Sequence, residues 1–193
     1  MLASEDGPGI VRRVARIGVF GRGEIGMVGS AGGFASVDQV AVVVRDLDAS
    51  MKRYVEEFGI GPWRVYTFSP DWIKGMTFRG EEQGYSMKLA LADLGGMMYE
   101  LIEPVRGPNS YQEFLDEHGE GLHHLGYFVD DLDAAIRDME SKGYRLLQSG
   151  RGIGTRGEGG YAYFETGGAL GHIIEAIELP QEMPPPEKTY PAE

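Results

Sequence analysis

The feature that most constrains the fold of this chain is an internal repeat. The segment VDQVAVVV at 37–44 resembles LHHLGYFV at 122–129, and each apolar run is followed, after one further residue, by Asp-Leu-Asp-Ala. A second pair of similar segments, YELIEP at 99–104 and IEAIEL at 174–179, closes the two halves. Such a repeat indicates two copies of one supersecondary unit that bury apolar surface against each other. We therefore expect two modules of the same topology.

Each module is expected to have the element order βαβββ. In residues 46–58, Leu47 and Met51 begin an apolar stripe with the spacing of an amphipathic helix. Asp46 and Asp131 occupy equivalent positions and are suited to cap the first turns of the two helices. After each helix, apolar runs separated by glycines predict strands. The predicted fold class is α+β, with two tandem βαβββ modules.

The two modules are expected at 36–110 and 111–180. Residues 1–35 are expected to form a flexible leader, and the proline-rich, acidic residues 181–193 a tail. The leader contains the G-x-G-x-x-G spacing of dinucleotide-binding loops at residues 21–26. That motif requires a helix to begin at its last glycine, whereas three more glycines follow here. A dinucleotide-binding fold is therefore not expected.

Composition narrows the partners and the type of metal ligand. The net charge of −12 argues against a nucleic-acid partner, because binding to phosphate requires a basic surface. No apolar run has the length of a membrane span, and the N-terminus does not resemble a signal peptide, so we expect a cytoplasmic protein without a membrane partner. The chain has no cysteine. Any metal ion must therefore be held by nitrogen and oxygen atoms.

The first strand of each module is expected to turn one face toward a concave surface. Side chains alternate along a strand, so Gln39 and Ala41 share one face, and His124 and Gly126 share the equivalent face of the second module. The small residues at 41 and 126 would leave room for a ligand there. His123 is then expected to point toward the helix side or an edge.

Two glutamates occur in the closing strands, where their neighbours are apolar. Glu100 and Glu175 occupy equivalent positions in MMYELI and HIIEAI. A carboxylate in an apolar strand is unfavourable unless another group compensates its charge. Together with Gln39 and His124, the two glutamates could surround one divalent cation. Nitrogen and oxygen ligands suit Zn, Mn, Ni, Co or Fe(II).

A duplicated βαβββ unit with the segments VDQVAVVVRDLDASMKRY and GEGLHHLGYFVDDLDAAI resembles the vicinal oxygen chelate superfamily. This group includes glyoxalase I, methylmalonyl-CoA epimerase, extradiol dioxygenases and bleomycin-resistance proteins. The resemblance covers residues 36–180 and implies a cup-shaped mixed sheet with helices outside. The segments GEGLHHLGYFVDDL and YELIEP look most similar to the epimerases. The resemblance assigns the metal ligands to Gln39, Glu100, His124 and Glu175, which is the ligand set of the eukaryotic type of glyoxalase I.

Glyoxalase I and the epimerases share chemistry at the carbon next to a carbonyl. A metal ion polarises the carbonyl oxygen and stabilises the enolate that forms when a base removes the α-proton. We expect Glu175 to be this base, with Glu100 as the second candidate. The sequence thus favours a metal-dependent lyase or isomerase acting on a small molecule. By analogy with the fold, a homodimer is expected.

Further residues are candidates for substrate binding. Aromatic side chains near the cup would suit an apolar substrate, and arginines in the loop 150–160 could bind an anionic group; these candidates are Trp63, Tyr66, Trp72, Phe128, Arg151 and Arg156. Two alternatives stay open. An iron-dependent dioxygenase would require two histidines and one carboxylate, whereas a drug-binding protein of this fold would require no metal.

Overall fold

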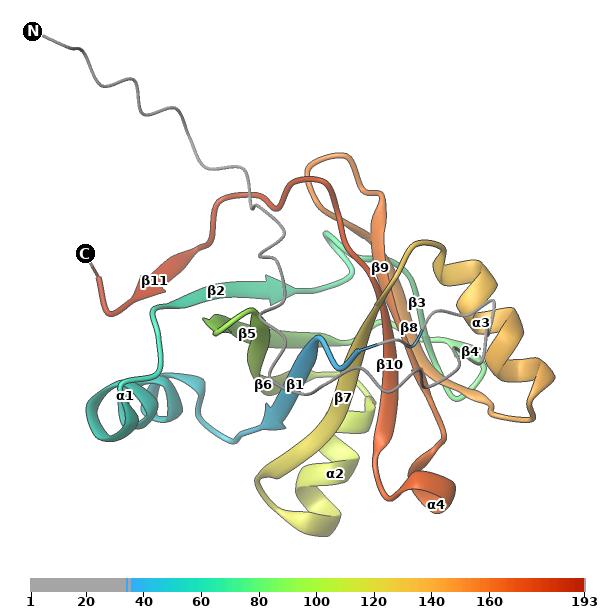
Figure 1. The fold of residues 1–193 in the computed structure, drawn as a ribbon, viewed down its shortest axis with the longest axis horizontal. Coiled ribbons are helices and arrows are strands. Elements are labelled where there is room, and N and C mark those ends of the chain that lie inside the picture. Colours follow the sequence, from blue (N-terminus) through green and yellow to red (C-terminus); the bar gives the residue numbers. More distant parts are fainter. Residues whose placement is uncertain (1–33, 35, 193) are drawn as a thin grey trace, which may run out of the picture.

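A computed structural model of the chain describes residue 34 and residues 36–192. The glycine motif at 21–26, and the expected leader apart from Phe34, lie outside these residues. The described part of the chain forms one 11-stranded mixed sheet with the order β11-β2-β5-β6-β1-β7-β10-β9-β8-β3-β4 (Figure 1). Its strands are β1 (Gln39–Val43), β2 (Trp63–Phe68), β3 (Lys74–Phe78), β4 (Glu81–Glu82), β5 (Ser86–Leu94), β6 (Met97–Arg106), β7 (Gly121–Val129), β8 (Leu146–Ile153), β9 (Gly159–Phe164), β10 (Ile173–Glu178) and β11 (Lys188–Tyr190).

The order of the strands repeats about the centre of the sheet. β2-β5-β6-β1 is mirrored by β8-β9-β10-β7, and the two halves meet where β1 pairs antiparallel with β7. In each half the first strand pairs parallel with the last, which places Ala41 opposite Glu100 and Gly126 opposite Glu175. The predicted α+β fold of two tandem βαβββ units is confirmed, although the exact boundaries between modules stay a prediction.

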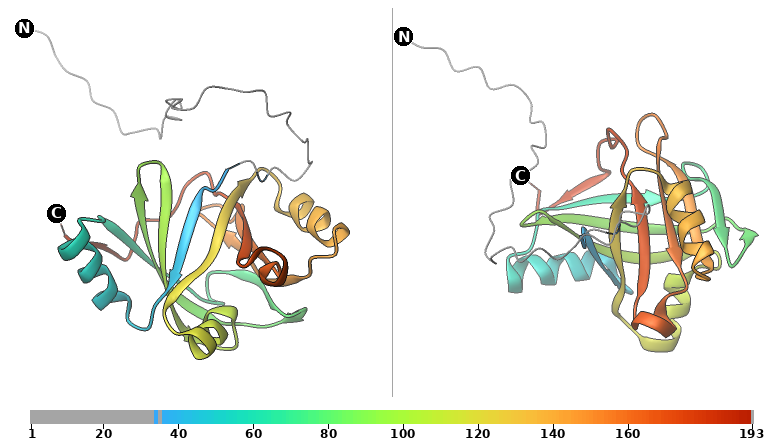
Figure 2. Two further views of the ribbon diagram at one scale, coloured as in Figure 1. Left: turned by 60° about the horizontal axis from the view of Figure 1, so that its bottom comes forward. Right: turned by 45° about the vertical axis from the view of Figure 1, so that its right-hand side comes forward.

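The two expected helices are confirmed and lie on the outside of the cup (Figure 2). α1 (Leu47–Phe58) and α3 (Leu132–Ser141) each begin after an aspartate. The side chain of this aspartate accepts a hydrogen bond from the backbone N–H three residues later in the chain. These aspartates are Asp46 and Asp131, as the sequence predicts. No helix in the described residues is long and apolar enough to cross a membrane.

Apolar side chains form three buried clusters, one inside the cup and one beneath each outer helix. Along β1, Ala41 and Val43 point into the cup, whereas Val42 and Val44, just after the strand, pack toward α1. This alternation agrees with the expected faces. It follows that polar side chains in register with Ala41 also point into the cup.

Several elements fall outside the repeat. α2 (Ser110–His118) precedes β7 and contacts β1, β6 and β7, and the short α4 (Gly167–Leu170) precedes β10. The β3–β4 hairpin leaves the first half of the sheet and pairs with β8 of the second. The segment that the sequence identifies as a proline-rich tail ends in β11, which pairs with β2. The β3–β8 and β11–β2 pairings both connect strands that are distant in sequence.

Candidate functional site

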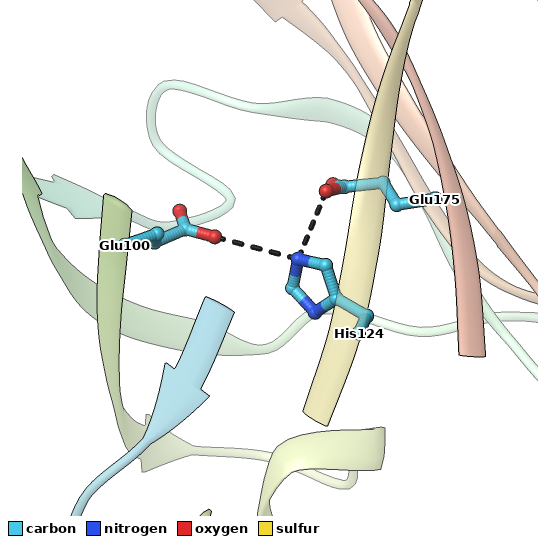
Figure 3. Close-up of side chains that lie close together, drawn as sticks. All are labelled: Glu100, His124 and Glu175. Atoms are coloured by element: carbon cyan, nitrogen blue, oxygen red, sulfur yellow. Dashed lines mark ion pairs between the residues drawn. The ribbon is translucent and has the colours of Figure 1, made fainter. Parts of the chain in front are cut away.

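Four polar side chains converge inside the cup from the four central strands. Gln39, Glu100, His124 and Glu175 come from β1, β6, β7 and β10, and all four are buried. Nε2 of His124 lies 2.9 Å from Oε2 of Glu175 and 3.5 Å from Oε2 of Glu100 (Figure 3). The same nitrogen lies 3.3 Å from Oε1 of Gln39. Each half of the repeat supplies two of the four groups.

The charges of these groups are strongly coupled. Burial lowers the pKa of His124, but the nearby carboxylates of Glu175 and Glu100 together outweigh it and raise this pKa to about 9. Burial also raises the pKa of Glu100, and the negative charge of Glu175 adds to this effect, although His124 opposes it. Without a bound cation, the imidazolium of His124 is therefore the positive charge that balances the carboxylates.

The donor set fits a divalent metal ion. The ligand atoms of Glu100, His124 and Glu175 lie within 4.8 Å of one another. An ion about 2.0–2.2 Å from each ligand would space nitrogen and oxygen ligands roughly 3–4 Å apart. Oε2 of Glu175 is buried, and once Nε2 of His124, 2.9 Å away, has lost its proton, this oxygen has no hydrogen-bond donor among the described residues. A buried oxygen in this state lacks the partner that a cation would provide.

Neighbouring residues orient the Gln39 and His124 side chains. Nε2 of Gln39 donates to Sδ of Met98 at 3.2 Å, which directs Oε1 toward His124. A Cβ added at Gly126 would lie 2.7 Å from this oxygen and 2.8 Å from Cβ of Gln39. The small residue at 126 therefore leaves room for the side chain of Gln39, whereas the sequence predicted room for a ligand.

His123 explains why the sequence has two adjacent histidines. Its Nδ1 lies 2.9 Å from Nδ1 of His124. Burial and the neighbouring His124 hold the pKa of His123 well below the usual value, so this ring is neutral. A neutral His123 can accept a hydrogen bond from Nδ1–H of His124, which leaves Nε2 of His124 free to bind a metal ion. The ring packs against Tyr111 and Phe114 of α2, a helix outside the repeat that the sequence analysis did not expect.

Gln39, Glu100 and Glu175 line a cavity of about 500 Å³, whereas His124 is fully buried and is not among the described residues that line it. Its walls are mainly apolar, with residues such as Phe68, Leu89 and Ile177. Four tyrosines also line it: burial raises the pKa of Tyr66, and it raises the pKa of Tyr111, Tyr161 and Tyr163 well above the usual value. Their hydroxyls therefore stay protonated as hydrogen-bonding groups. The Tyr163 ring lies 4.8 Å from the ring of His124.

A sequence profile described as the Glyoxalase/Bleomycin resistance protein/Dioxygenase superfamily matches residues 38–164. The chain belongs to this superfamily. The family resemblance expected from the repeat is thereby confirmed, and the match includes the β1, β6 and β7 ligand positions.

Similar curated proteins include methylmalonyl-CoA epimerases. The mitochondrial enzyme of Mus musculus is 27% identical over 123 residues, which cover 63% of this chain and 61% of that protein. The enzyme of Bos taurus is 27% identical over 75 residues, 38% of this chain and 43% of that protein. The chain thus spans less than two thirds of the length of these curated relatives.

Solved structures give the same picture of the fold. The methylmalonyl-CoA epimerase of Mycobacterium tuberculosis has a TM-score of 0.57 at 24% identity, covering 80% of this chain and 95% of that chain. The Streptomyces coelicolor epimerase in complex with 2-nitronate-propionyl-CoA has a TM-score of 0.58 at 21% identity, covering 79% and 100%. At these identities the similarity shows the fold.

The expected substrate residues are only partly brought together in this superfamily member. Tyr66 lines the cavity, and Trp72 packs beside it against Phe68. Trp63 is fully buried on the other side of the sheet, beneath α1. It lies three positions before Tyr66 in β2, so the alternation of side chains places the two on opposite faces. Phe128 is half-buried on β7 and is not among the described residues that line the cavity.

The two arginines of the 150–160 loop also lie outside the cavity lining. Arg151 pairs with Asp133 and lies 3.8 Å from Glu178. Arg156 donates to Oε1 of Gln181 at 3.0 Å. Both guanidinium groups have partners within the chain, and their expected anion-binding role stays a prediction.

Several cavity residues were missed by the sequence analysis. Tyr161 and Tyr163 lie on β9, and all six residues of this strand are buried, so no alternation marks the face that points inward. Tyr111 lies on α2, a helix outside the repeat. Arg64 was identifiable, because it shares a strand face with Tyr66.

Proposed function

We propose that the protein binds one divalent metal ion at Gln39, Glu100, His124 and Glu175 and catalyses proton transfer at a carbon next to a carbonyl. The observation that carries this proposal is the convergence of four buried nitrogen and oxygen ligands on one point of an apolar cavity. Membership of the superfamily and the similarity to epimerases support an isomerase over a lyase. The identity of the metal is left to experiment.

A bound divalent ion would polarise the substrate carbonyl and stabilise negative charge on its oxygen. Glu175 supplies the base: its carboxylate is buried and lines the cavity, and on leaving the metal ion it would have an oxygen available to take a proton. This oxygen takes the α-proton while the electron pair of the C–H bond moves into a carbon–carbon double bond and charge develops on the carbonyl oxygen. Protonated Glu175 then returns the proton to the opposite face of the enolate carbon, which completes the isomerisation and restores the carboxylate. The apolar walls exclude water during these steps.

The first test is metal content, measured by plasma mass spectrometry on untagged protein. We expect about one equivalent of a divalent ion in the wild type and its loss in His124→Ala, because this substitution removes the central ligand. His118→Ala, which removes an exposed histidine of α2, is the control and should retain the ion. A wild type that takes up no Zn, Ni, Co or Mn would refute the metal site and favour a metal-free binding protein.

The second test addresses the base. Deuterium incorporation from D2O can be followed by NMR with 2-oxo acids, hemithioacetals and acyl-CoA esters as substrates. Glu175→Gln should keep the ion and lose about 10²–10⁴-fold in exchange rate, the usual contribution of a general base. Glu140→Gln, on the exposed face of α3, is the matched control. Unchanged exchange in Glu175→Gln would exclude this role for Glu175 and direct attention to Glu100.

An iron-dependent dioxygenase is less well supported. The site has one histidine and two carboxylates, whereas that chemistry is typical of two histidines and one carboxylate. The second histidine, His123, is turned toward α2. The homodimer and the cytoplasmic location stay predictions.

A further inference from the structure

The open side of the cup is crossed by residues 180–190, here called the strap. The strap runs from the end of β10 to β11, which lies beside β2 (Figure 1). At its beginning Pro180 packs over Gly154, where an added Cβ would collide with the proline ring. The backbone N–H of Thr155 donates to the carbonyl of Glu182 at 2.9 Å. This end of the strap is therefore fixed to the second module.

The other end of the strap is fixed to the first module. The backbone N–H of Glu187 donates to the carbonyl of Val65 at 2.9 Å. Its carboxylate accepts hydrogen bonds from the backbone N–H and the hydroxyl of Thr67, at 2.8 and 3.0 Å. β11 then continues the antiparallel pairing with β2. The strap thus connects opposite rims of the cup.

The middle of the strap forms a wall of the cavity. Met183 packs against the apolar cluster inside the cup, and Pro184, Pro185 and Pro186 line the cavity beside it. Consecutive prolines have restricted φ angles and no N–H donors, so they form a stiff, apolar surface. The strap therefore contributes shape and apolar surface to the cavity, with little capacity to adapt to a bulky ligand.

The charges that line the cavity are mostly negative. The carboxylates are those of Glu100, Glu175, Glu178 and Glu182, and Arg64 is the single arginine or lysine among the described lining residues. A CoA thioester carries several phosphate charges, which proteins bind with clusters of Arg and Lys. Even with Glu100 and Glu175 compensated by a metal ion, Glu178 and Glu182 outnumber Arg64, so the lining offers no cluster of cations for such a ligand. A compact molecule with one carboxylate could instead reach Arg64, which forms no ion pair in the described part of the chain.

We propose that the strap restricts the site to compact, mainly apolar carbonyl compounds with at most one negative charge, and excludes CoA thioesters. The proposal rests on the function proposed above and names its substrate class. The cavity volume of about 500 Å³ lies within the range of pockets that enclose drug-sized ligands, roughly 300–1,000 Å³. Arg64 at the rim would pair with the carboxylate, and the carbonyl would lie toward His124.

Calorimetric titration of the full-length, metal-loaded protein tests this selectivity. The probes are phenylpyruvate, a compact apolar 2-oxo acid, and methylmalonyl-CoA. We expect wild type to bind phenylpyruvate at least tenfold more tightly. The double substitution Thr67→Val with Glu187→Ala removes the two side-chain hydrogen bonds of the strap, and we expect it to reduce this preference at least tenfold. Asp48→Asn removes only the exposed ion pair with Lys188 on β11 and should leave the preference unchanged.

A second variant keeps the strap attached. Met183→Trp places a larger side chain in the cavity wall and should weaken phenylpyruvate binding at least tenfold. This arm gives a result even if the double variant does not fold. Methylmalonyl-CoA binding to the wild type as tightly as phenylpyruvate, or no binding of either, would overturn the proposal. So would phenylpyruvate binding that neither strap change affects.

The two proposals fail in different ways. Metal content is measured on every sample, so a wild type without metal that still prefers phenylpyruvate contradicts the proposed catalysis but supports the strap as a selectivity element. A wild type with one equivalent of metal that prefers methylmalonyl-CoA supports the metal site and refutes the substrate class.

Discussion

Metal binding at the candidate site should be coupled to proton release. In the metal-free protein Glu175 and Glu100 raise the pKa of His124 to about 9. At pH 7 nearly every molecule therefore carries His124 as an imidazolium, with a proton on both ring nitrogens. A metal ion that binds Nε2 must displace the proton on that nitrogen. The gap of roughly two pKa units weakens metal binding at pH 7 by about 2.7 kcal/mol, or roughly 100-fold. Affinity should therefore rise about tenfold per pH unit up to pH 9.

Calorimetry measures this coupling directly. Zn²⁺ titrations at pH 7 in two buffers with different ionisation enthalpies should give about one proton released per ion, with any contribution from Glu100 in the same direction. His118→Ala should release the same number, because this side chain is exposed and lies outside the site. Metal binding that released no protons, with an affinity independent of pH between 6.5 and 9, would refute the charge state derived for His124.

The same shift predicts the pH dependence of stability without metal. The pKa of His124 is higher in the folded than in the unfolded protein, so the stabilisation is fully present below about pH 6.5 and is lost as pH rises through about 9. The raised pKa of Glu100 acts in the same direction. Denaturant unfolding of the metal-free protein should lose about 3 kcal/mol over this interval, whereas His124→Gln should lack most of this dependence.

Three further substitutions test the architecture. Gly126→Ala should reduce metal affinity about 10–100-fold, because the added Cβ displaces Gln39 and an orienting contact is lost. The control is Gly168→Ala, whose added Cβ meets nothing within 4 Å and which should leave metal affinity unchanged. Trp63→Ala should destabilise the protein by about 3–5 kcal/mol in urea unfolding but leave phenylpyruvate affinity per folded molecule unchanged, since Trp63 lies beneath α1. Asp46→Ala should cost about 1 kcal/mol of unfolding free energy, because it removes the hydrogen bond to the N–H of Ala49; an unchanged midpoint would exclude the cap.

The repeat predicted more of the site than any single motif. The correspondence between Gln39 and His124 and between Glu100 and Glu175 was sufficient to place all four side chains in one cup, because equivalent strands of two similar modules meet at the centre of one sheet. Residue type alone would have left Gln39 unremarkable.

The features that sequence could not predict depend on contacts between distant segments. Trp63 was misplaced because its aromatic character was weighted above its position in β2, where alternation sets it on the face opposite to Tyr66. The strap has no periodicity, and its course is fixed by Gly154 and Thr67, residues far away in the sequence. Proline content predicted a tail at 181–193, but it did not indicate that this segment lies across the cup.

The β3–β4 hairpin has a consequence for how ligands enter. β3 pairs with β8, and the hydroxyls of Thr77 and Ser149 lie 2.8 Å apart at this contact. The two modules are therefore joined both at the β1–β7 pair and through this hairpin, so they cannot separate about β1 and β7 as a hinge without breaking strand pairing. Residues 180–187 of the strap belong to no strand, so the strap is the easier part to displace. Ligand association should then be limited by how often the strap opens, on the µs–ms scale of loop gating, and the observed rate should reach a plateau as ligand concentration increases.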